Sequence, residues 1–181
     1  EHKRVSDMRF VESAAREVGS VLRAGNLCVL ESTSPPYSTR MVEKIVSEVS
    51  GLAPEQFMTA HCPERIIPGR MLIELRENDR IIGSNRPESA EFAKEIYEKV
   101  VTGGTIRLTD DLTAEMCKLT ENTFRDINIA YANELSKVCD RLGIDVFKLI
   151  ELANCHPRVN VHTPGVGVGG HCIAVDPWFI H

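Results

Sequence analysis

Apolar residues recur along the chain at two spacings, and these predict alternating helices and strands. Between residues 8 and 22 they keep the period of about 3.6 residues that an amphipathic helix requires, with Asp7 as the expected cap. The apolar run at 27–30 is typical of a buried parallel strand. A helical segment at 39–49 and an apolar run at 57–60 complete a strand–helix–strand unit. This N-terminal part therefore indicates a doubly wound sheet.

The alternation continues after the second strand. Further strands are predicted at 80–83 and 105–108, and the helix between them, at 87–101, begins with a proline, which suits a first helical turn. We therefore expect an α/β fold in which part of a Rossmann-like parallel sheet is followed by a mainly helical central domain.

One segment is exceptional in its length. From 111 to 142 the chain contains no proline or glycine, and its apolar residues keep a near-helical period. At about 1.5 Å per residue a single helix here would be about 48 Å long, several times the usual length. Such a helix is typical of a bridge between domains or subunits. Gly143 is expected to end it, and Asp145 to cap a shorter helix that reaches about Ala153.

The composition excludes several classes of protein. With 43% hydrophobic and 26% charged residues, the 181-residue chain is neither disordered nor collagen-like. Its apolar runs are far shorter than the roughly 18 residues of a membrane-spanning helix. A net charge of -5, with Lys and Arg scattered, offers no basic surface for nucleic acid. The chain begins without Met or an apolar leader, so we expect it to be part of a longer polypeptide.

The six cysteines include no C-x-x-C pair, which excludes a zinc ribbon or a thioredoxin-type motif. Free thiols in a reducing cytoplasm are expected instead of a disulfide scaffold. Three adjacent His–Cys pairs lack the spacing of tetrahedral zinc ligands, so we expect no metal site. Packing roles are expected for Cys28, Cys62, Cys117 and Cys139.

A glycine-rich segment at 165–170 matches the dinucleotide fingerprint G-x-G-x-x-G letter for letter. That fingerprint binds a nucleotide only where a strand precedes it, a helix follows it and an acidic residue lies about 20 positions on. Here Pro164 precedes the segment and Pro177 follows soon after. We therefore favour a loop that contacts substrate, with an ordinary turn-rich loop as the alternative.

The same loop leads to the strongest candidate for a nucleophile. Gly169 and Gly170 allow the backbone to approach a ligand, and the Cys172 thiol follows them, with Asp176 four residues later. An accessible thiol with polar neighbours favours the reactive thiolate. The alternative is that Cys172 is a small hydrophobic core residue, as unpaired cysteines often are.

Other candidates lie on the long helix and at the ends of strands. Lys118, Asn122 and Arg125 are spaced so that they share one helix face, and together they suit an anionic or oxyanionic ligand. The alternative is a solvated polar stripe. Thr33 and Glu64 follow the first two predicted strands, at the edge where open α/β sheets bind ligands. Either could instead cap the segment that follows it.

Four segments are specific enough to compare with known families. They are Glu31-Ser-Thr-Ser-Pro-Pro36, His61-Cys-Pro-Glu-Arg65, Glu115-Met-Cys-Lys-Leu-Thr-Glu-Asn122 and Gly169-Gly-His-Cys-Ile-Ala-Val-Asp-Pro177. Together they resemble the UDP-glucose/GDP-mannose dehydrogenases over nearly the whole chain. The resemblance implies a two-step oxidation of a sugar C6 alcohol to a carboxylate with two NAD per sugar. UDP-N-acetyl-D-mannosamine is the expected substrate, with UDP-N-acetylglucosamine and UDP-glucose as alternatives.

The resemblance also implies roles for individual residues. Cys172 would hold the aldehyde as a thiohemiacetal and then as a thioester. Lys118 would stabilise the oxyanion, and Asn122 would help to position it. Glu64 and Asp176 would handle protons and water, with Glu64 as the base for thioester hydrolysis. Contacts with the sugar nucleotide are implied for Arg65, Ile66, Lys118, Asn122, Arg125, His156, Arg158 and Gly169.

The resemblance divides the chain into two parts. Residues 1–105 would be the C-terminal part of a NAD-binding Rossmann-like domain, with Thr33 near NAD, and residues 106–181 a central domain for dimerisation and catalysis. The half with the true G-x-G-x-x-G loop and a C-terminal UDP-binding domain are expected to be absent, so the fragment alone should be inactive. The long helix would form the core of a homodimer. A non-catalytic dimerisation module with an inert Cys172 is the alternative to an enzyme.

Overall fold

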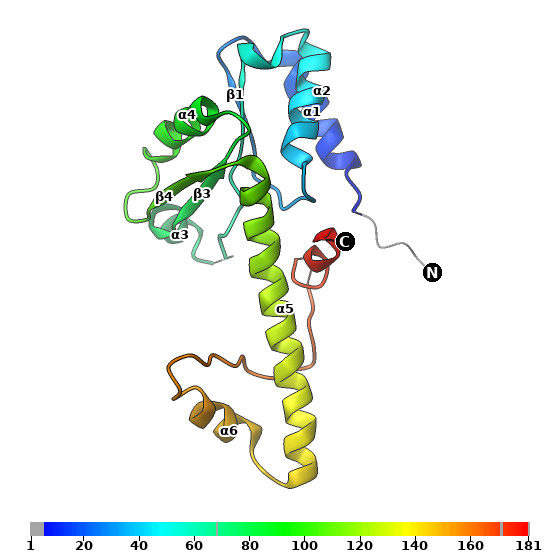
Figure 1. Cartoon of the computed structure of the whole chain (residues 1–181), viewed down its shortest axis with the longest axis vertical. Coiled ribbons are helices and arrows are strands. Elements are labelled where there is room, and N and C mark those ends of the chain that lie inside the picture. The colour runs from blue at the N-terminus through cyan, green and yellow to red at the C-terminus, as the bar shows by residue number, and fades with distance from the viewer. Residues whose placement is uncertain (1–5, 68, 171, 181) are drawn as a thin grey trace. The chain divides into compact units, whose positions relative to one another are not determined.

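The computed structural model describes residues 6–67, 69–170 and 172–180 (Figure 1). The chain forms two compact units, one ending at Lys118 and the other extending from Leu119 to Phe179, so the long helix belongs to both. The domain boundary expected between residues 105 and 106 stays a prediction. Glu1 to Val5, Pro68, His171 and His181 lie outside the described residues.

The first unit is built on a four-stranded sheet with the order β1-β2-β3-β4. The strands are β1 (Leu27–Leu30), β2 (Met58–His61), β3 (Arg80–Gly83) and β4 (Ile106–Thr109). β1 pairs with β2 in parallel, and β3 pairs with β4 in parallel. The expected parallel-dominated sheet is therefore confirmed, with β1 at one edge.

The two parallel pairs meet through one antiparallel contact, in which His61 of β2 lies opposite Gly83 of β3. Each of these residues is the last of its strand, so the ends of β2 and β3 lie side by side. The chain between them contains the helix α3 (Met71–Glu77), which the sequence pattern did not predict. None of its residues is buried, and about two helical turns present no recurring apolar face. This connection does not carry the chain back across the sheet, as a parallel pairing would require.

Helices cover both faces of this sheet. They are α1 (Arg9–Val21), α2 (Ser38–Ser50) and α4 (Pro87–Tyr97). Leu30 of β1 packs with residues of α1 and α2, whereas its neighbour Val29 packs with a cluster that includes α4. Because both faces are covered, β1 is apolar throughout instead of alternating. Full burial of a side chain such as Val46 stabilises the fold by about 1.5–3 kcal/mol.

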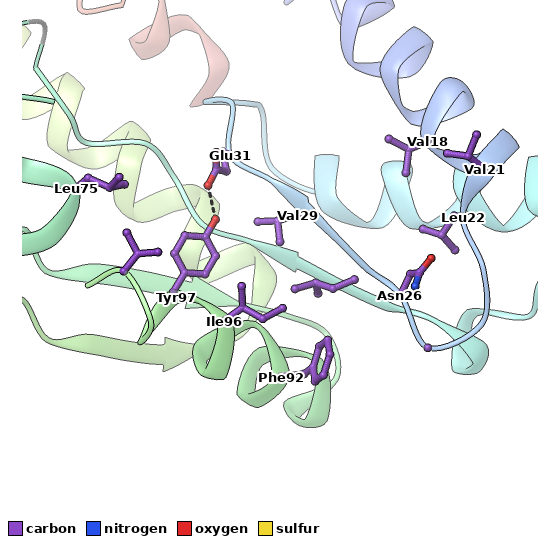
Figure 2. Close-up of a pocket in the computed structure, with 13 residues that line it drawn as sticks. Val18, Val21, Leu22, Asn26, Val29, Glu31, Leu75, Phe92, Ile96 and Tyr97 are labelled. Atoms are coloured by element: carbon purple, nitrogen blue, oxygen red, sulfur yellow. Dashed lines mark hydrogen bonds between the residues drawn. The ribbon is translucent and has the colours of Figure 1, made fainter. Parts of the chain in front are cut away.

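An apolar hollow of about 720 Å³ extends along β1 (Figure 2). Val29 of β1 lies in it together with Val18 of α1 and Phe92 of α4. Its most polar feature is a hydrogen bond in which the Tyr97 hydroxyl donates to the Glu31 carboxylate. Burial raises the pKa of Tyr97, so this hydroxyl remains protonated and donates. The edge of the sheet therefore presents a mainly apolar surface.

The long helix is confirmed as α5 (Asp111–Leu142), with 32 residues. Its start packs closely on the end of β3. A Cβ on Gly83 would come within 2.3 Å of the Asp110 carbonyl oxygen and 2.5 Å of the Ala114 side chain. Only glycine fits at this position, and the first turns of α5 are therefore fixed to the sheet.

Helix caps agree with the sequence at one of two positions. Asp145 caps α6 (Val146–Ala153) as expected, and its carboxylate accepts from two backbone N–H groups of the first turn. At α1 the cap position is Met8 instead of the expected Asp7. The Asp7 carboxylate instead binds the side chain of Arg9 in an exposed ion pair. After α6 the chain forms loops up to a short 3-10 helix, η2 (Asp176–Ile180).

The part of α5 in the second unit carries a line of exposed apolar side chains. Phe124, Ile127, Tyr131 and Val138 are all exposed, at spacings that place them on one side of the helix. Ile129, which lies on another side, is half-buried. Among the described residues, no helix combines the length and the apolar character that crossing a membrane requires.

Candidate active site

In the first unit, Thr33 and Glu64 lie in the loops that follow β1 and β2, as the sequence predicts. The Glu64 carboxylate is fixed by the next two residues, because its Oε1 accepts from the N–H groups of Arg65 and Ile66 over 2.6 and 2.7 Å. The Arg65 side chain donates to the Asp79 carbonyl oxygen over 3.2 Å. The Glu64 side chain is 42% exposed, so its second oxygen can accept a proton from a ligand or from water.

Arg80 is a candidate that the sequence pattern did not reveal. Its side chain is 1% exposed, and its Nη1 lies 3.4 Å from Oε1 of Glu64. Its Nε and Nη2 have no hydrogen-bond partner within the part of the chain that the structure describes. A buried guanidinium is unfavourable unless an anion compensates it, and Glu64 provides that charge. The sequence feature that could have indicated Arg80 is a charged residue at the first position of an otherwise apolar strand.

The structure separates the thiols by exposure. Cys172 is exposed, so the interpretation of this residue as part of the core is wrong. Cys62 and Cys139 are buried, as their expected packing role requires. Burial raises the pKa of Cys62 to about 11 and also raises the pKa of Cys28. Cys155 is exposed as well, and its Sγ contacts the carbonyl oxygen one turn earlier in the chain.

In the second unit, Cys172 is connected to two other predicted site residues. Its carbonyl oxygen accepts from the N–H groups of Val175 and Asp176, each over 2.9 Å, which forms the turn that leads into η2. The Asp176 carboxylate in turn accepts from the Asn122 amide over 2.5 Å. Asn122 and Asp176 are 3% and 4% exposed. The thiol is therefore presented to solvent by a turn that a buried hydrogen bond attaches to α5.

The remaining candidate site residues differ in their exposure and in their contacts. Lys118 is half-buried, and its amine makes no ion pair with the residues that the structure describes. His156 and Arg158 lie together, with the N–H of Arg158 donating to Nδ1 of His156 over 3.3 Å. Arg125 and Gly169 are exposed and face solvent.

The glycine-rich segment at 165–170 is a loop, and among the described residues between α6 and η2 no strand precedes it and no α-helix follows it. The expectation of a loop instead of a dinucleotide fingerprint is therefore confirmed. Gly167 and Gly170 have φ angles of 132° and 86°, which other residues rarely adopt. The N–H of Gly165 donates to the Asn133 side chain over 2.8 Å, and this bond attaches the loop to α5.

A carboxylate from α5 occupies the amino end of α2. Glu115, which is 1% exposed, accepts from the N–H groups of Tyr37 and Thr39 over 2.6 and 2.7 Å. It also accepts from the Thr39 hydroxyl over 2.6 Å. One turn earlier on α5, Asp111 forms a two-point ion pair with Arg40. The sequence could have indicated that these two carboxylates are buried, because both share a helix face with apolar residues.

The predicted site residues fall into two groups. The first unit holds Thr33, Glu64, Arg65, Ile66 and Lys118, and the second holds Asn122, Arg125, His156, Arg158, Gly169, Cys172 and Asp176. Within each unit, the structure brings some of these predicted residues into hydrogen-bond contact with one another. The joint action of the two groups stays a prediction.

The chain is similar to two family models and to several named proteins. Residues 1–101 match the family model for the NAD binding domain of the UDP-glucose/GDP-mannose dehydrogenase family, and residues 112–181 match that for its central domain. The NDP-N-acetyl-D-galactosaminuronic acid dehydrogenase of Ralstonia nicotianae is 53% identical. The UDP-N-acetyl-D-mannosamine dehydrogenase of Escherichia coli K12 is 52% identical. Each match covers 96% of this chain and 43% of the relative.

A solved structure agrees with these matches. The UDP-D-ManNAc dehydrogenase of Pyrococcus horikoshii aligns with a TM-score of 0.94 and 46% identity, over 98% of this chain and 42% of that one. The chain thus spans less than half the length of the relatives that it matches. Since two adjoining family models match most of its residues, the chain belongs to the UDP-glucose/GDP-mannose dehydrogenase family.

Proposed function

We propose that this chain is the catalytic part of an NAD-dependent dehydrogenase that oxidises the C6 alcohol of UDP-N-acetyl-D-mannosamine to the uronic acid. Relatives named for N-acetylated sugar nucleotides support this substrate class. One structural observation carries the proposal, namely the connection of Cys172, Asp176 and Asn122 in the second unit. An exposed thiol on a turn that is fixed by buried polar groups is typical of a nucleophilic site.

The reaction would pass through two covalent states of Cys172. When bound, NAD would supply the hydride acceptor for each of the two oxidations. The Cys172 thiolate would add to the aldehyde carbon, so that a C–S bond forms and the carbonyl oxygen takes up a proton. Loss of that proton and of the second hydride leaves a thioester. Water then forms a C–O bond to the same carbon, the C–S bond breaks, and Cys172 leaves as a thiolate.

Four other side chains would assist these steps. Lys118, whose amine has no ion-pair partner among the described residues, would donate to the negative oxygen that develops at C6. Asn122 gives one amide hydrogen to Asp176 and keeps the other for the same oxygen. Asp176 would hold that amide in place. Glu64, fixed through Oε1, would take the proton of the attacking water on Oε2.

The sugar nucleotide would be bound by charged and backbone groups. Two exposed arginines, Arg125 and Arg158, suit the diphosphate because a guanidinium can donate two hydrogen bonds to one phosphate. His156 would be oriented by its contact with Arg158. The further proposed contacts are those of Arg65, Ile66, Lys118, Asn122 and Gly169.

The first unit contains a place that suits NAD. The loop after β1 offers the hydroxyl of the half-buried Thr33 at an edge where α/β sheets bind nucleotides. Helix amino ends often bind phosphate, but that of α2 is filled, since its N–H groups donate to Glu115. Thr33 would therefore contact NAD, and the pyrophosphate would need donors other than this helix end.

The chain would work as part of a longer enzyme. Residues 1–105 would complete a NAD-binding domain whose G-x-G-x-x-G half lies elsewhere in the polypeptide, and residues 106–181 would form the central domain, beside a further domain that binds UDP. The apolar hollow along β1 supports this arrangement, because a surface of this size and character is usually covered by another segment. An exposed, unoxidised Cys172 would also require a reducing compartment such as the cytoplasm.

The decisive experiment counts NADH released per UDP-N-acetyl-D-mannosamine consumed, using the complete polypeptide that contains this chain. Two NADH per sugar are expected. A ratio of one would contradict the thioester half of the reaction and the role of Cys172. UDP-N-acetylglucosamine and UDP-glucose are assayed in parallel. If the enzyme oxidises only one of these two, the proposed reaction stands but the proposed substrate is wrong.

A non-catalytic dimerisation module is the second candidate. The exposed apolar line on α5 favours it, since such a surface is typical of a helix that meets a second copy. The same experiment separates the two functions, because a dimerisation module would release no NADH with any UDP-sugar.

A further inference from the structure

We infer that Glu115 is a positioning residue that couples the loop carrying Thr33 to the helical turn carrying Lys118. This inference rests on the proposed function, in which Thr33 contacts NAD and Lys118 stabilises the oxyanion. Glu115 itself would touch neither substrate nor cofactor. Its effect would pass through the two segments that it joins.

The amino end of α2 is unusual. Its cap residue is Tyr37, which has a φ of 72° and provides no side-chain cap. A left-handed conformation is unfavourable for a tyrosine, and it persists only where surrounding contacts impose it. Here the Tyr37 N–H donates to Glu115, and the Thr39 N–H does the same. The missing cap is therefore supplied by a residue 78 positions further along the chain.

The charge of Glu115 depends on its buried surroundings. All three groups that contact its carboxylate are donors, namely two N–H groups and the Thr39 hydroxyl. Burial raises the pKa of Glu115, and the hydrogen bonds from Thr39 and Tyr37 oppose that effect. The carboxylate and the loop conformation thus depend on each other. If the loop moves, a buried charge loses its partners, and if the charge is removed, the loop loses its acceptor.

The loop between Thr33 and Tyr37 is held by prolines and hydrogen bonds. Pro35 and Pro36 lie between them, and their rings fix two backbone angles. The Ser38 hydroxyl donates to the Pro35 carbonyl oxygen over 2.6 Å, and the buried Ser34 donates to the carbonyl oxygen two residues earlier. A segment stiffened in this way transmits a displacement at Tyr37 to Thr33.

On α5, Glu115 lies close to Lys118. Lys118 lies three residues after Glu115, within one helical turn, and in the same compact unit as the Thr33 loop. The start of this helix is already fixed to the sheet by the close approach of Gly83 to Asp110. Glu115 thus adds a specific contact between the Thr33 loop and the turn that presents Lys118.

Asp111 provides a matched control. It also joins α5 to α2, through a two-point ion pair with Arg40, and it is as deeply buried as Glu115. However, its partner is a side chain inside α2 and not the backbone that leads to Thr33. A contact that only holds the two helices together would be weakened equally by Asp111→Asn and by Glu115→Gln.

The test compares these two variants in the complete enzyme, with turnover expressed per active site counted by thiol titration. Glu115→Gln places an amide group against N–H donors, so we expect a fall in kcat of roughly 10- to 100-fold, as is typical of misplaced reacting groups. The KM for the sugar nucleotide should change little. The deuterium isotope effect on kcat, measured with a C6-deuterated sugar, should increase because hydride transfer becomes the slow step. Asp111→Asn should lower the melting temperature but leave kcat per site and the isotope effect near those of the wild type.

Equal losses of kcat in the two variants, with no change in isotope effect, would overturn the positioning role. Glu115→Asp keeps the charge but shortens the side chain, and it provides the second test if Glu115→Gln does not fold. It should show a smaller loss of kcat with a raised isotope effect, and wild-type values would again overturn the inference. A wild-type enzyme that releases no NADH would instead contradict the proposed function, so the two failures are distinguishable.

Discussion

The amide of Asn122 donates to the carboxylate of Asp176 over 2.5 Å, although the two residues are 54 positions apart in the chain. Both are buried, so the bond is protected from competition with water. A buried hydrogen bond to a charged group stabilises a fold by about 1.5–3 kcal/mol. Because the same Asp176 closes the backbone turn that starts at Cys172, this bond fixes the segment that presents the thiol.

Replacement of Cys172 by serine should abolish the second NADH. The hydroxyl of serine is far less acidic than a thiol and does not form a thioester, so less than about 0.1% of the four-electron turnover should remain. Stopped-flow measurement of NADH, with the sugar products identified by mass spectrometry, checks this. Cys155→Ser is the matched control, because Cys155 is also exposed and belongs to the same unit. Equal activity in the two variants would contradict the role of Cys172.

Replacement of Glu64 by glutamine should slow hydrolysis more than oxidation. The amide can still accept the two backbone N–H bonds, but it no longer takes a proton from water. We expect a rapid release of two NADH per active site, followed by a steady rate that is roughly 100-fold slower. Intact-protein mass spectrometry should then detect the thioester on Cys172. Absence of both the burst and the adduct would assign hydrolysis to another residue.

His61 should make the stability of the protein depend on pH. Burial lowers its pKa to about 4, so the folded chain resists protonation where the unfolded chain, with an ordinary pKa near 6.5, accepts a proton. The free energy of unfolding should therefore be highest above about pH 6.5 and should fall by about 3 kcal/mol as the pH decreases to about 4.

Urea unfolding of the wild type and of His61→Phe at several pH values isolates this contribution. The phenylalanine ring has a similar size and does not titrate, so the variant should lose less stability over this interval. Both proteins contain the same carboxylates, and acid protonates these equally. Parallel pH curves for the two proteins would show that His61 does not contribute.

The apolar line on α5 should mediate self-association. Ile127 is 61% exposed on the line that contains Phe124 and Tyr131, so a charge there would be buried if a second copy covered it. Ile127→Glu should yield monomers in light scattering, whereas Asp140→Lys, which changes the charge of an exposed residue on the opposite side of the helix, should not. Ile129 is half-buried within its own unit, and its substitution would destabilise the chain itself. An unchanged dimer in Ile127→Glu would exclude this surface.

Features set by local sequence were predictable, and those set by long-range contacts were not. β1 and α5 were visible because an uninterrupted apolar run and a helix without Pro or Gly leave few alternatives. α3 and the antiparallel contact of β2 with β3 escaped prediction, since a helix of seven residues has no clear period. The direction of a strand also depends on how its connection packs.

The same distinction applies to the candidate site. Cys172 and Asp176 stand out in the sequence because unusual residue types occur together in a glycine-rich segment. Arg80 and Glu115 do not, because their importance comes from partners that the fold supplies. Arg80 meets Glu64 because the chain after His61 runs antiparallel to β3, which brings the residues that follow β2 alongside the start of β3. Glu115 meets Tyr37 only since the start of α5 packs on the sheet beside α2.

The open edge of β1 makes the sheet prone to pair with other chains until the rest of the proposed enzyme covers it. An edge strand presents unpaired N–H and carbonyl groups, and such a row is a template on which a foreign strand can add. Here the template is flanked by an apolar hollow, which would strengthen that addition. In the longer enzyme proposed above, aggregation of the sheet would therefore compete with the arrival of the segment that is expected to cover β1.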